Sequence, residues 1–563
     1  MYVLGIATDH VNSAAALLKD GELIACFEED RLRKVKNRCF FPELAIGECL
    51  RFSGITIKDI DIVAVNHDPV KVFCLDSLKY WASPHLARKL FWRTVYYCSF
   101  YRRLQKNFEK CFPSCLKLIW PRVKFFEHHL CHAASSYFLS PFEGAAILTA
   151  DGNGESATVL YAHAQGASLR KIKEIHYPAS LGKFYTTITE YLGFTPHAGE
   201  GTVMALAAYG DKEYCPRFDK FIKADKNGLL QLDMRYFTFY DQRSKRWSNK
   251  FEREFGMPRV AGGKLETRHC QIAAAAQVTL EKNILLMLDW LKKAVGGDNL
   301  CLAGGVFLNC SLNSVIRKSG LFKNIYVQPA MNDVGTAFGA GFLWHVQNTG
   351  LNTPRKDFVN PYLGREFYAD EIEQSLRKHD FNFQYCPDVG KTAAAYLAEG
   401  KVVAWFQGRA EMGPRALGNR SLLASPCENS MREHINAHIK HREWFRPFAP
   451  AVLAERFHDY FKEPWRSPFM LYTNEFRETK QDEVPACVHK DGTARPQSVE
   501  RQANPLFYHL ISEFDKISGV PMVLNTSFNL RGKPIVDSPD DALAVFKNSP
   551  IEVLCVGPYC CHK

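Results

Sequence analysis

The sequence predicts an α/β fold in which short apolar strands lead into glycine-bearing turns. Strand-like runs at residues 2–7, 14–18, 23–26 and 62–65 indicate a β-meander followed by β/α units. Four later glycine-bearing turns follow strand-like runs and carry Asp, Glu or Asn: 151–155, 200–201, 304–305 and 333–335. Ligands of open α/β sheets bind beyond the carboxyl ends of the strands. We therefore expect a cleft for a nucleotide and a metal ion in the first half of the chain.

The remaining elements are predicted by apolar runs and by the polar, Gly- and Pro-containing stretches that separate them. Further strands are expected at 145–150, 158–162, 300–302, 325–327 and 402–406, and a helix-rich segment at 268–295. A polar stretch with Gly and Pro at 346–362 indicates a domain boundary. The region after it has its own strand, arginine cluster and glycine turns, so we expect it to fold as a second domain.

Length and composition describe a globular protein. A chain of 563 residues is too long for one core and predicts several structural units. The 18 cysteines lack the spacing of a disulfide framework, so we expect reduced thiols and a cytoplasmic location. No apolar run is long enough to span a membrane, and residues 2–7 look like a first strand, not a signal peptide.

Much of the net charge of +11 lies in one stretch, residues 66–124, which has 12 Lys or Arg against three acidic residues. The same stretch is rich in Tyr, Trp and Phe. Basic residues interleaved with aromatics could bind nucleic acid or an anionic surface. The alternative is a helical insertion with an aromatic inner face and a solvated basic face, and we favour it.

A candidate metal site lies between residues 127 and 155. His128 and His132 are four residues apart, so on a helix both imidazoles project from one face. Asp151 follows a predicted strand on a glycine-rich turn. Two nitrogens and an oxygen suit zinc, iron(II) or manganese. A structural or surface role for the two histidines is the alternative.

A second constellation is rich in arginine. It comprises residues 408–420, 440–450, 491–495 and 525–529. Arginine forks match phosphate oxygens, and a glycine-rich backbone lets an anion approach closely. Separated arginine motifs of this kind would suit two polyanions, such as ATP and a phosphorylated small molecule. Surface salt bridges are the alternative.

At these residues the chain resembles the carbamoyltransferase family of nodulation protein U and the cephalosporin hydroxymethyl and tobramycin carbamoyltransferases. The resemblance covers nearly the whole chain. Its motifs are His10 with Ser13, then 28–31, 128–132, 151–155, 180–182, 199–206, 304–309, 332–333, 411–421, 442–450, 491–497 and 525–529.

The resemblance implies two domains with separate chemistry. Residues 1–355, with the basic insertion at about 66–124, would form an actin/hexokinase-like, two-lobed domain of the Kae type. Residues 356–563 would form a YrdC-like α/β domain. The YrdC-like domain would make carbamoyladenylate from carbamoyl phosphate and ATP. The first domain would pass the carbamoyl group to a hydroxyl of a small-molecule natural product or sugar.

The resemblance also implies roles for particular residues. The metal ligands would be His128, His132, Asp151 and Asp333, with iron(II) as the expected ion. Carbamoyladenylate would contact Lys36, Gly182, Gly305 and Asn332, with Lys34 as the rival of Lys36. ATP, accompanied by Mg²⁺, and carbamoyl phosphate would contact Arg415, Arg446, Arg495 and Asn525. His10 would assist the acceptor hydroxyl as a general base.

Two departures from the family pattern bear on these roles. Thr202 stands where the family often has Lys, and Val11-Asn12 follows His10 where an acidic or small residue is usual. The alternative functions are a tRNA threonylcarbamoyl-transfer enzyme, with the basic insertion as its RNA face, and a non-catalytic nucleotide-binding regulator. We expect no membrane or nucleic-acid partner. A homodimer is compatible with the resemblance, although no residue pattern specifies the oligomeric state or the acceptor.

Overall fold

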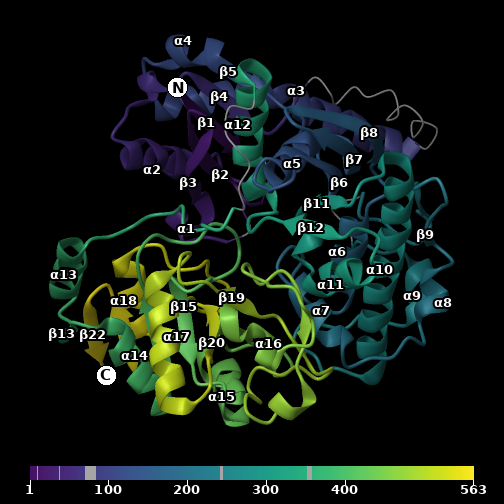
Figure 1. Cartoon of the computed structure of the whole chain (residues 1–563). Helices are drawn as coiled ribbons and strands as arrows, with labels where there is room; N and C mark the ends of the chain where they lie inside the picture. Colours follow the sequence, from purple (N-terminus) through teal and green to yellow (C-terminus); the bar gives the residue numbers. More distant parts are fainter. Residues whose placement is uncertain (9–10, 37, 70–83, 241–244, 351–357) are drawn as a thin grey trace. The chain divides into compact units, whose positions relative to one another are not determined.

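The computed structural model describes residues 1–8, 11–36, 38–69, 84–240, 245–350 and 358–563. The chain forms two compact units (Figure 1). The first comprises Met1–Glu29 and Asn37–Phe358, and the second comprises Asp30–Lys36 and Val359–Lys563. The short segment Asp30–Lys36 therefore belongs to the second unit, so a single boundary along the chain does not separate the two units.

The first unit contains a five-stranded sheet with the order β3-β2-β1-β4-β5. Its strands are β1 Tyr2–Ala7, β2 Ala14–Lys19, β3 Glu22–Glu28, β4 Ile62–Val65 and β5 Val123–Phe125. The first three form an antiparallel meander, and β4 and β5 join parallel to β1. The expected meander at the N-terminus is confirmed.

A second sheet in the same unit repeats this topology, with the order β8-β7-β6-β11-β12. Its strands are β6 Gly144–Ala150, β7 Ala157–Gln165, β8 Ser168–His176, β11 Asn299–Ala303 and β12 Asn324–Val327. Again three strands form an antiparallel meander and two join parallel to the first. The first unit is thus an internal duplication that the sequence does not reveal as a repeat.

Two helices cross between the sheets. Helix α5, His128–Tyr137, follows the last strand of the first sheet but packs against β6, β7 and β11 of the second. Helix α12, Asp333–Thr349, follows the second sheet but packs against β1, β2 and β4 of the first. The two helices also pack tightly against each other, and a Cβ on Gly339 would lie 2.0 Å from the carbonyl oxygen of Cys131. Only glycine permits this approach.

The other elements of the first unit surround the sheets. They are α2 Glu43–Ser53, α3 Pro84–Cys111, α4 Leu116–Ile119, α6 Leu181–Tyr191, α7 Glu200–Ala207, α8 Cys215–Phe218, β9 Ile222–Ala224, β10 Leu230–Leu232, α9 Asn249–Phe255, α10 Thr267–Val295 and α11 Cys310–Lys318. Helix α1, Glu29–Arg33, begins in the first unit and continues in the second. The predicted helix at 268–295 is confirmed by α10.

Two of the four expected glycine turns are helical. Glu200 and Gly201 begin α7, and Asp333–Gly335 is the first turn of α12. At Gly335 the glycine serves close packing, since a Cβ there would lie 2.4 Å from the carbonyl oxygen of Ala330. The prediction of turns at these positions was wrong because a glycine required by packing looks the same in sequence as one required by a turn.

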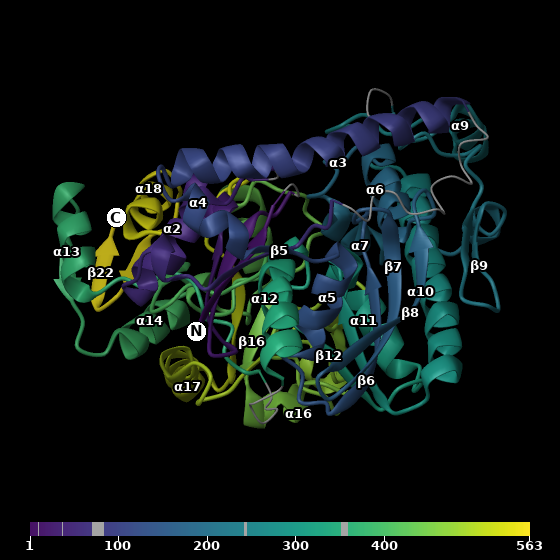
Figure 2. The same ribbon diagram turned by 90° about the horizontal axis from the view of Figure 1, so that it is seen from above.

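The described part of the basic insertion is mostly helical, and α3 is its long helix (Figure 2). Phe100, Leu104 and Phe108 recur every four residues and are buried, whereas Arg102 and Lys106 are exposed. Phe108 packs edge-on against Phe41 with ring centroids 5.3 Å apart. Over this part of α3 the apolar inner face and the solvated basic face are confirmed. Residues 70–83 lie outside the described part of the chain.

The second unit is built on one eight-stranded mixed sheet with the order β13-β22-β21-β14-β15-β20-β16-β19. Its strands are β13 Phe383–Tyr385, β14 Val403–Phe406, β15 Arg420–Ala424, β16 Ala449–Leu453, β19 Gln497–Val499, β20 Met522–Ser527, β21 Val553–Val556 and β22 Tyr559–His562. The strands β17 Asn474–Glu475 and β18 Thr493–Ala494 form a separate pair. The helices are α13 Ala369–Lys378, α14 Val389–Ala398, α15 Asn429–His434, α16 Phe457–Tyr460, α17 Pro505–Ser518 and α18 Pro539–Lys547. Trp405, Leu422 and Leu524 lie in its core.

Two general expectations can be compared with the structure. Among the described residues, no helix is long and apolar enough to cross a membrane. The cysteines whose side chains the structure describes are free thiols, in agreement with the absence of framework spacing in the sequence.

Candidate metal centre and anion site

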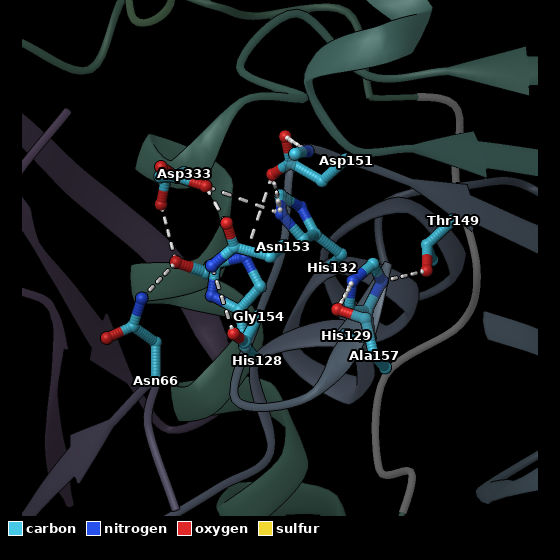
Figure 3. Close-up of polar contacts among 12 residues, drawn as sticks. Asn66, His128, His129, His132, Thr149, Asp151, Asn153, Gly154, Ala157 and Asp333 are labelled. Atoms are coloured by element: carbon cyan, nitrogen blue, oxygen red, sulfur yellow. Dashed lines mark hydrogen bonds and ion pairs between the residues drawn. The ribbon is translucent and has the colours of Figure 1, made fainter. Parts of the chain in front are cut away.

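Four side chains from three places in the first unit converge on one point (Figure 3). His128 is the first residue of α5, and His132 lies one turn further along the same face. Asp151 directly follows β6, and Asp333 is the first residue of α12. All four expected metal ligands are thus brought together by helix starts and a strand end.

The distances within this group suit a single metal ion. His132 Nε2 lies 3.2 Å from Asp151 Oδ2 and 3.6 Å from Asp333 Oδ1. His128 Nε2 lies 3.7 Å and 3.4 Å from the same two oxygens. Four ligands at about 2.1 Å from a tetrahedral ion would be about 3.4 Å apart. The group is largely buried, and its nitrogen and oxygen donors suit zinc, iron(II) or manganese.

The charges of this group also favour a cation. Burial of the His128 ring opposes its charge, but hydrogen bonds to Asp151 and Asp333 raise the pKa of His128 to about 10. Burial would raise the pKa of Asp151, yet its contacts with the two histidines hold that pKa well below the usual value. In the metal-free protein a proton therefore offsets part of the carboxylate charge. A divalent cation would take over this role, with both imidazoles neutral.

The buried carboxylate of Glu155 holds the backbone of the metal ligand His128. Glu155, which is 6% exposed, accepts hydrogen bonds from the backbone N–H of His128 at 3.0 and 3.2 Å. It also accepts one from the backbone N–H of Asp68 at 2.9 Å. An acidic group at a helix N-terminus satisfies free N–H groups and complements the helix dipole. The sequence indicated Glu155 only as part of a motif, without this role.

The other helix start is held by Asn66, which follows β4. Its Nδ2 donates to Thr336 Oγ1 at 2.7 Å, and that hydroxyl donates to the backbone carbonyl of Asp333 at 2.5 Å. The side-chain oxygen of Asn66 accepts from the backbone N–H of Thr8 at 3.1 Å. Sequence reasoning missed Asn66 and Thr336, because neither lies in a pattern that indicates a partner 270 residues away.

His129, between the two ligands, has a structural role. Its Nε2 lies 3.1 Å from the carbonyl oxygen of Ala157, which can only accept, so this nitrogen carries the proton. Its Nδ1, at 2.6 Å, then accepts from the hydroxyl of Thr149. Burial, with the charges of His128 and His132, lowers the pKa of His129 well below its usual value. The neutral ring ties α5 to β6 and β7 (Figure 3).

Of the residues expected to contact carbamoyladenylate, Gly182 and Gly305 lie against the turn of Asp151, and Asn332 directly precedes Asp333. A Cβ on Gly182, in the first turn of α6, would lie 2.7 Å from the backbone nitrogen of Gly152. A Cβ on Gly305 would lie 3.1 Å from Asp151 Oδ1. Asn332 is 7% exposed, and its side-chain oxygen has no hydrogen-bond partner among the described residues. Glycine thus permits close backbone approach here, and Asn332 has an oxygen that can accept a hydrogen bond from a ligand.

A cluster of cations lies in the second unit, built around Lys440, Arg442, Arg446 and Arg495. Burial and the nearby charges of Arg442 and Arg446 lower the pKa of Lys440 well below its usual value. Burial and the charges of Arg446 and Arg495 lower the pKa of Arg442 in the same way. These residues repel one another across a poorly solvated region. A bound anion would offset that repulsion, so the cluster is a candidate anion site.

Lys440 was not among the expected contacts, yet it is the most buried cation of the cluster, at 5% exposed. Its ammonium donates to Asn529 Oδ1 at 2.8 Å, to the backbone carbonyl of Asn529 at 3.0 Å, and to the carbonyl of Ser527. All three acceptors are neutral, so the positive charge is held without being cancelled.

Asn525 lies on β20 next to the loop that carries Arg415. It is 1% exposed, and its Nδ2 donates to Gln497 Oε1 at 3.0 Å and to the carbonyl of Ala416 at 3.3 Å. Its side-chain oxygen has no hydrogen-bond partner among the described residues. The expected contact residues Asn525 and Arg415 therefore lie on adjoining segments.

The loop before β15 is wound around Glu411. One carboxylate oxygen accepts three backbone hydrogen bonds, from Leu417 at 2.7 Å, Asn419 at 2.9 Å and Arg420 at 3.1 Å. From the segment at 30–36, Arg31 donates to the carbonyl of Glu411 at 2.6 Å. The loop that carries Arg415 is therefore held in place by Glu411.

The two other arginines of that motif, Arg409 and Arg420, donate to backbone carbonyls and have a structural role. The guanidinium of Arg420 is fully buried and donates to the carbonyls of Gln407, Gly408 and Arg365. Arg409 donates to the carbonyls of Leu363 and Gly364. Their hydrogen-bonding capacity is directed to the backbone. A motif alone does not distinguish an arginine that binds a carbonyl from one that binds a phosphate.

The two rival lysines differ in their surroundings. Lys34 forms an ion pair with Asp541 at 2.6 Å. Lys36 belongs to the second unit, where its charge contributes to the lowered pKa of Lys440. Lys36 is therefore associated with the cation cluster. His10, the expected general base, lies outside the described residues.

Fold and sites together define a mixed α/β protein with a candidate metal centre in one unit and a candidate anion site in the other. Two family descriptions match the chain: Carbamoyltransferase N-terminus over residues 2–342 and Carbamoyltransferase C-terminus over residues 394–563. The chain belongs to the carbamoyltransferase family and is a carbamoyltransferase enzyme.

Several relatives are similar over most of their length. An uncharacterized protein of Synechocystis is 37% identical, over 98% of this chain and 95% of its own. Nodulation protein NolNO of Sinorhizobium fredii is 36% identical, over 98% of this chain and 79% of its own. Nodulation protein U of the same species is 28% identical, over 95% of this chain and 94% of its own.

Solved structures are less similar. Component A of the (R)-2-hydroxyglutaryl-CoA dehydratase of Acidaminococcus fermentans is 14% identical, with a TM-score of 0.36 over 62% of this chain and 98% of its own. HypF of T. kodakarensis is 13% identical, with a TM-score of 0.33 over 63% of this chain and 48% of its own.

Proposed function

We propose that this protein is an ATP-dependent O-carbamoyltransferase that makes carbamoyladenylate in its second unit and transfers the carbamoyl group in its first. The observation that carries the proposal is the buried cation cluster around Lys440, in a carbamoyltransferase chain that also brings together His128, His132, Asp151 and Asp333. An adenylate-forming step needs a site for polyanions, and the cluster offers one.

In the proposed first step the second unit binds Mg²⁺-ATP and carbamoyl phosphate. Arg446 and Arg495, with Arg415 and the side-chain oxygen of Asn525, would hold the phosphate groups and the carbamoyl amide. Carbamoyl phosphate would lose phosphate to water, and the resulting carbamate oxygen would attack the α-phosphorus of ATP. The products are carbamoyladenylate, pyrophosphate and phosphate. The buried cations stabilise the charge that is transferred to pyrophosphate.

In the proposed second step the first unit binds carbamoyladenylate beside the metal centre. Gly182 and Gly305 would let the ligand approach the backbone, and Asn332 would accept a hydrogen bond from the carbamoyl amide. His128, His132, Asp151 and Asp333 would hold iron(II) or another divalent cation, which when bound would supply positive charge next to the phosphate and carbonyl oxygens. The acceptor hydroxyl would attack the carbamoyl carbon, AMP would leave, and His10 would take the hydroxyl proton.

The acceptor in this proposal is a hydroxylated small molecule or sugar. We also propose that the first unit is of the actin/hexokinase-like Kae type and the second of the YrdC type. The duplicated sheet, with the same strand order in both halves, supports the assignment of the first unit.

The test is a reaction of the purified protein with ATP, carbamoyl phosphate and a panel of hydroxylated acceptors. We expect AMP and pyrophosphate to be released only when carbamoyl phosphate is present, and mass spectrometry to find one added carbamoyl group on an acceptor. ATP turnover that is indifferent to carbamoyl phosphate would contradict the proposal. Salt-sensitive tRNA binding would instead favour the alternative of a tRNA-modifying enzyme.

A further inference from the structure

The basic loop, residues 440–446, carries three cations of the anion site and follows a π-helical turn, Ile435–Ile439. Within that turn lies Asn436, which is 2% exposed. π-Helical turns are rare and frequently occur at functional sites. No motif or comparison assigns a role to Asn436.

The side chain of Asn436 contacts the loop at three places. Its Nδ2 donates to the carbonyl of Arg446 at 3.0 Å and to the carbonyl of Trp444 at 3.4 Å. Its Oδ1 accepts from Nε of Arg442 at 2.7 Å. The backbone carbonyl of Asn436 accepts from the backbone N–H of Arg442 at 3.1 Å. One buried amide thus fixes both ends of the Arg442–Arg446 segment.

The amide suits this position for an electrostatic reason. Burial and the charge of Arg446 lower the pKa of Arg442, and burial with the charges of Arg442 and Arg446 lowers the pKa of Lys440, so cations of the loop repel one another. A carboxylate would hold Arg442 more strongly, but it would cancel charge that an anion needs. A neutral amide can accept from the guanidinium and donate to the carbonyls while it leaves the positive charge in place.

We propose that Asn436 is a positioning residue of the anion site: it holds the basic loop so that Arg442 and Arg446 face a bound phosphate group. This inference rests on the proposed function for its ligand, but the ordering of the loop is measurable without any ligand.

The first test is hydrogen exchange of the peptide that spans the basic loop, in the free full-length protein. In Asn436→Ala we expect the amides of this peptide to exchange faster than in the wild type. Asp388→Ala is the matched control, since Asp388 caps α14 through the N–H of Lys391 and has no bond to the loop. It should lower thermal stability and leave exchange in the loop unchanged. Loop exchange in Asn436→Ala equal to the wild type would overturn the proposal.

The second test is calorimetric titration with pyrophosphate and with Mg²⁺-ATP. Asn436→Ala should weaken binding by about tenfold or more, because small displacements of positioned groups are costly. Asn436→Asp keeps the contact with Arg442 but adds a negative charge, so its loop should exchange more slowly than in Asn436→Ala while its affinity is no higher. If Asn436→Asp both protects the loop better and binds the two ligands more tightly than Asn436→Ala, the electrostatic role of the neutral amide would be overturned.

The outcomes separate this inference from the proposed function. If the wild-type protein binds neither pyrophosphate nor Mg²⁺-ATP, the proposed adenylation fails, while loop exchange still decides whether Asn436 positions the loop. If the wild type binds both and Asn436→Ala binds them equally well, the inference alone is overturned.

Discussion

His128 and Asp333 occupy equivalent positions in the two halves of a duplicated unit, and their side chains meet with Nε2 of His128 3.4 Å from Oδ1 of Asp333. Each is the first residue of the helix that follows the fifth strand of its sheet. Because α5 and α12 start side by side, the positive ends of two helix dipoles also face this point. The duplication therefore places the metal ligands at the N-termini of two helices, where the helix dipoles also favour a bound anion.

The first prediction concerns the metal ligands. Asp333→Asn preserves shape but removes a carboxylate charge from the group. We expect metal affinity to fall by more than about tenfold, since even outer-shell partners contribute about 10–100-fold. The metal content of the dialysed protein, measured by inductively coupled plasma mass spectrometry, tests this loss of affinity. His163→Gln, on β7 and outside the ligand group, should keep the wild-type stoichiometry. Full metal retention in Asp333→Asn would count against the site.

The second prediction concerns Glu155. Glu155→Ala would leave the buried backbone N–H of His128 and the half-buried N–H of Asp68 without their acceptor. Each unsatisfied group costs about 1–3 kcal/mol, so the free energy of unfolding should fall by that order. Glu155→Gln keeps an acceptor oxygen and should lose less. Denaturant unfolding of the metal-free proteins measures both, and equal losses in the two variants would argue against the hydrogen-bonding role.

The third prediction uses a pair of glycines. In Gly182→Ala the new methyl group would lie 2.7 Å from the backbone nitrogen of Gly152, so α6 must move away from the Asp151 turn. We expect a loss of about 1–3 kcal/mol in stability, together with weaker metal binding. Gly47→Ala, in an exposed part of α2 with open space around it, should stabilise the protein by about 0.5–1 kcal/mol. Thermal unfolding and metal titration distinguish the two outcomes.

The fourth prediction concerns the anion site. Arg446→Ala removes a cation whose charged form is opposed by burial and by the charge of Arg495 and favoured by Glu443, so thermal stability should change little while affinity for Mg²⁺-ATP falls. Loss of a charge-assisted hydrogen bond costs about 1.5–3 kcal/mol, or roughly 10–150-fold in the dissociation constant.

The control for this prediction is Arg466→Ala, which removes a surface ion pair with Glu500. Such pairs contribute little, so neither stability nor nucleotide binding should change by much. Calorimetric titration and thermal unfolding measure both quantities. A large loss of stability in Arg446→Ala with unchanged binding would mean that Arg446 is structural.

Much of the local structure was predictable because its signals are local. The apolar runs indicated β1, β2, β3, β4 and β6, and the spacing of His128 and His132 indicated one face of α5. The outer contacts of the sites were not predictable. Asn66 reaches Thr336 across 270 residues, and Lys440 reaches Asn529 across 89. Neither partner lies in a periodic pattern that indicates the other.

By itself the sequence determined the α/β class, the two regions, the candidate ligands His128, His132 and Asp151, and the arginine-rich motifs; Asp333 was implied by the family resemblance. These follow from residue type and short spacing, which the sequence records directly. Only the tertiary structure decided that His128 and Asp333 are topological equivalents, that Arg409 and Arg420 bind carbonyls, and that residues 30–36 belong to the second unit. The physical reason is that these features depend on contacts between residues that are far apart in the sequence. Helices α5 and α12 each pack against the sheet of the other half, and backbone hydrogen bonds hold the loop around Glu411.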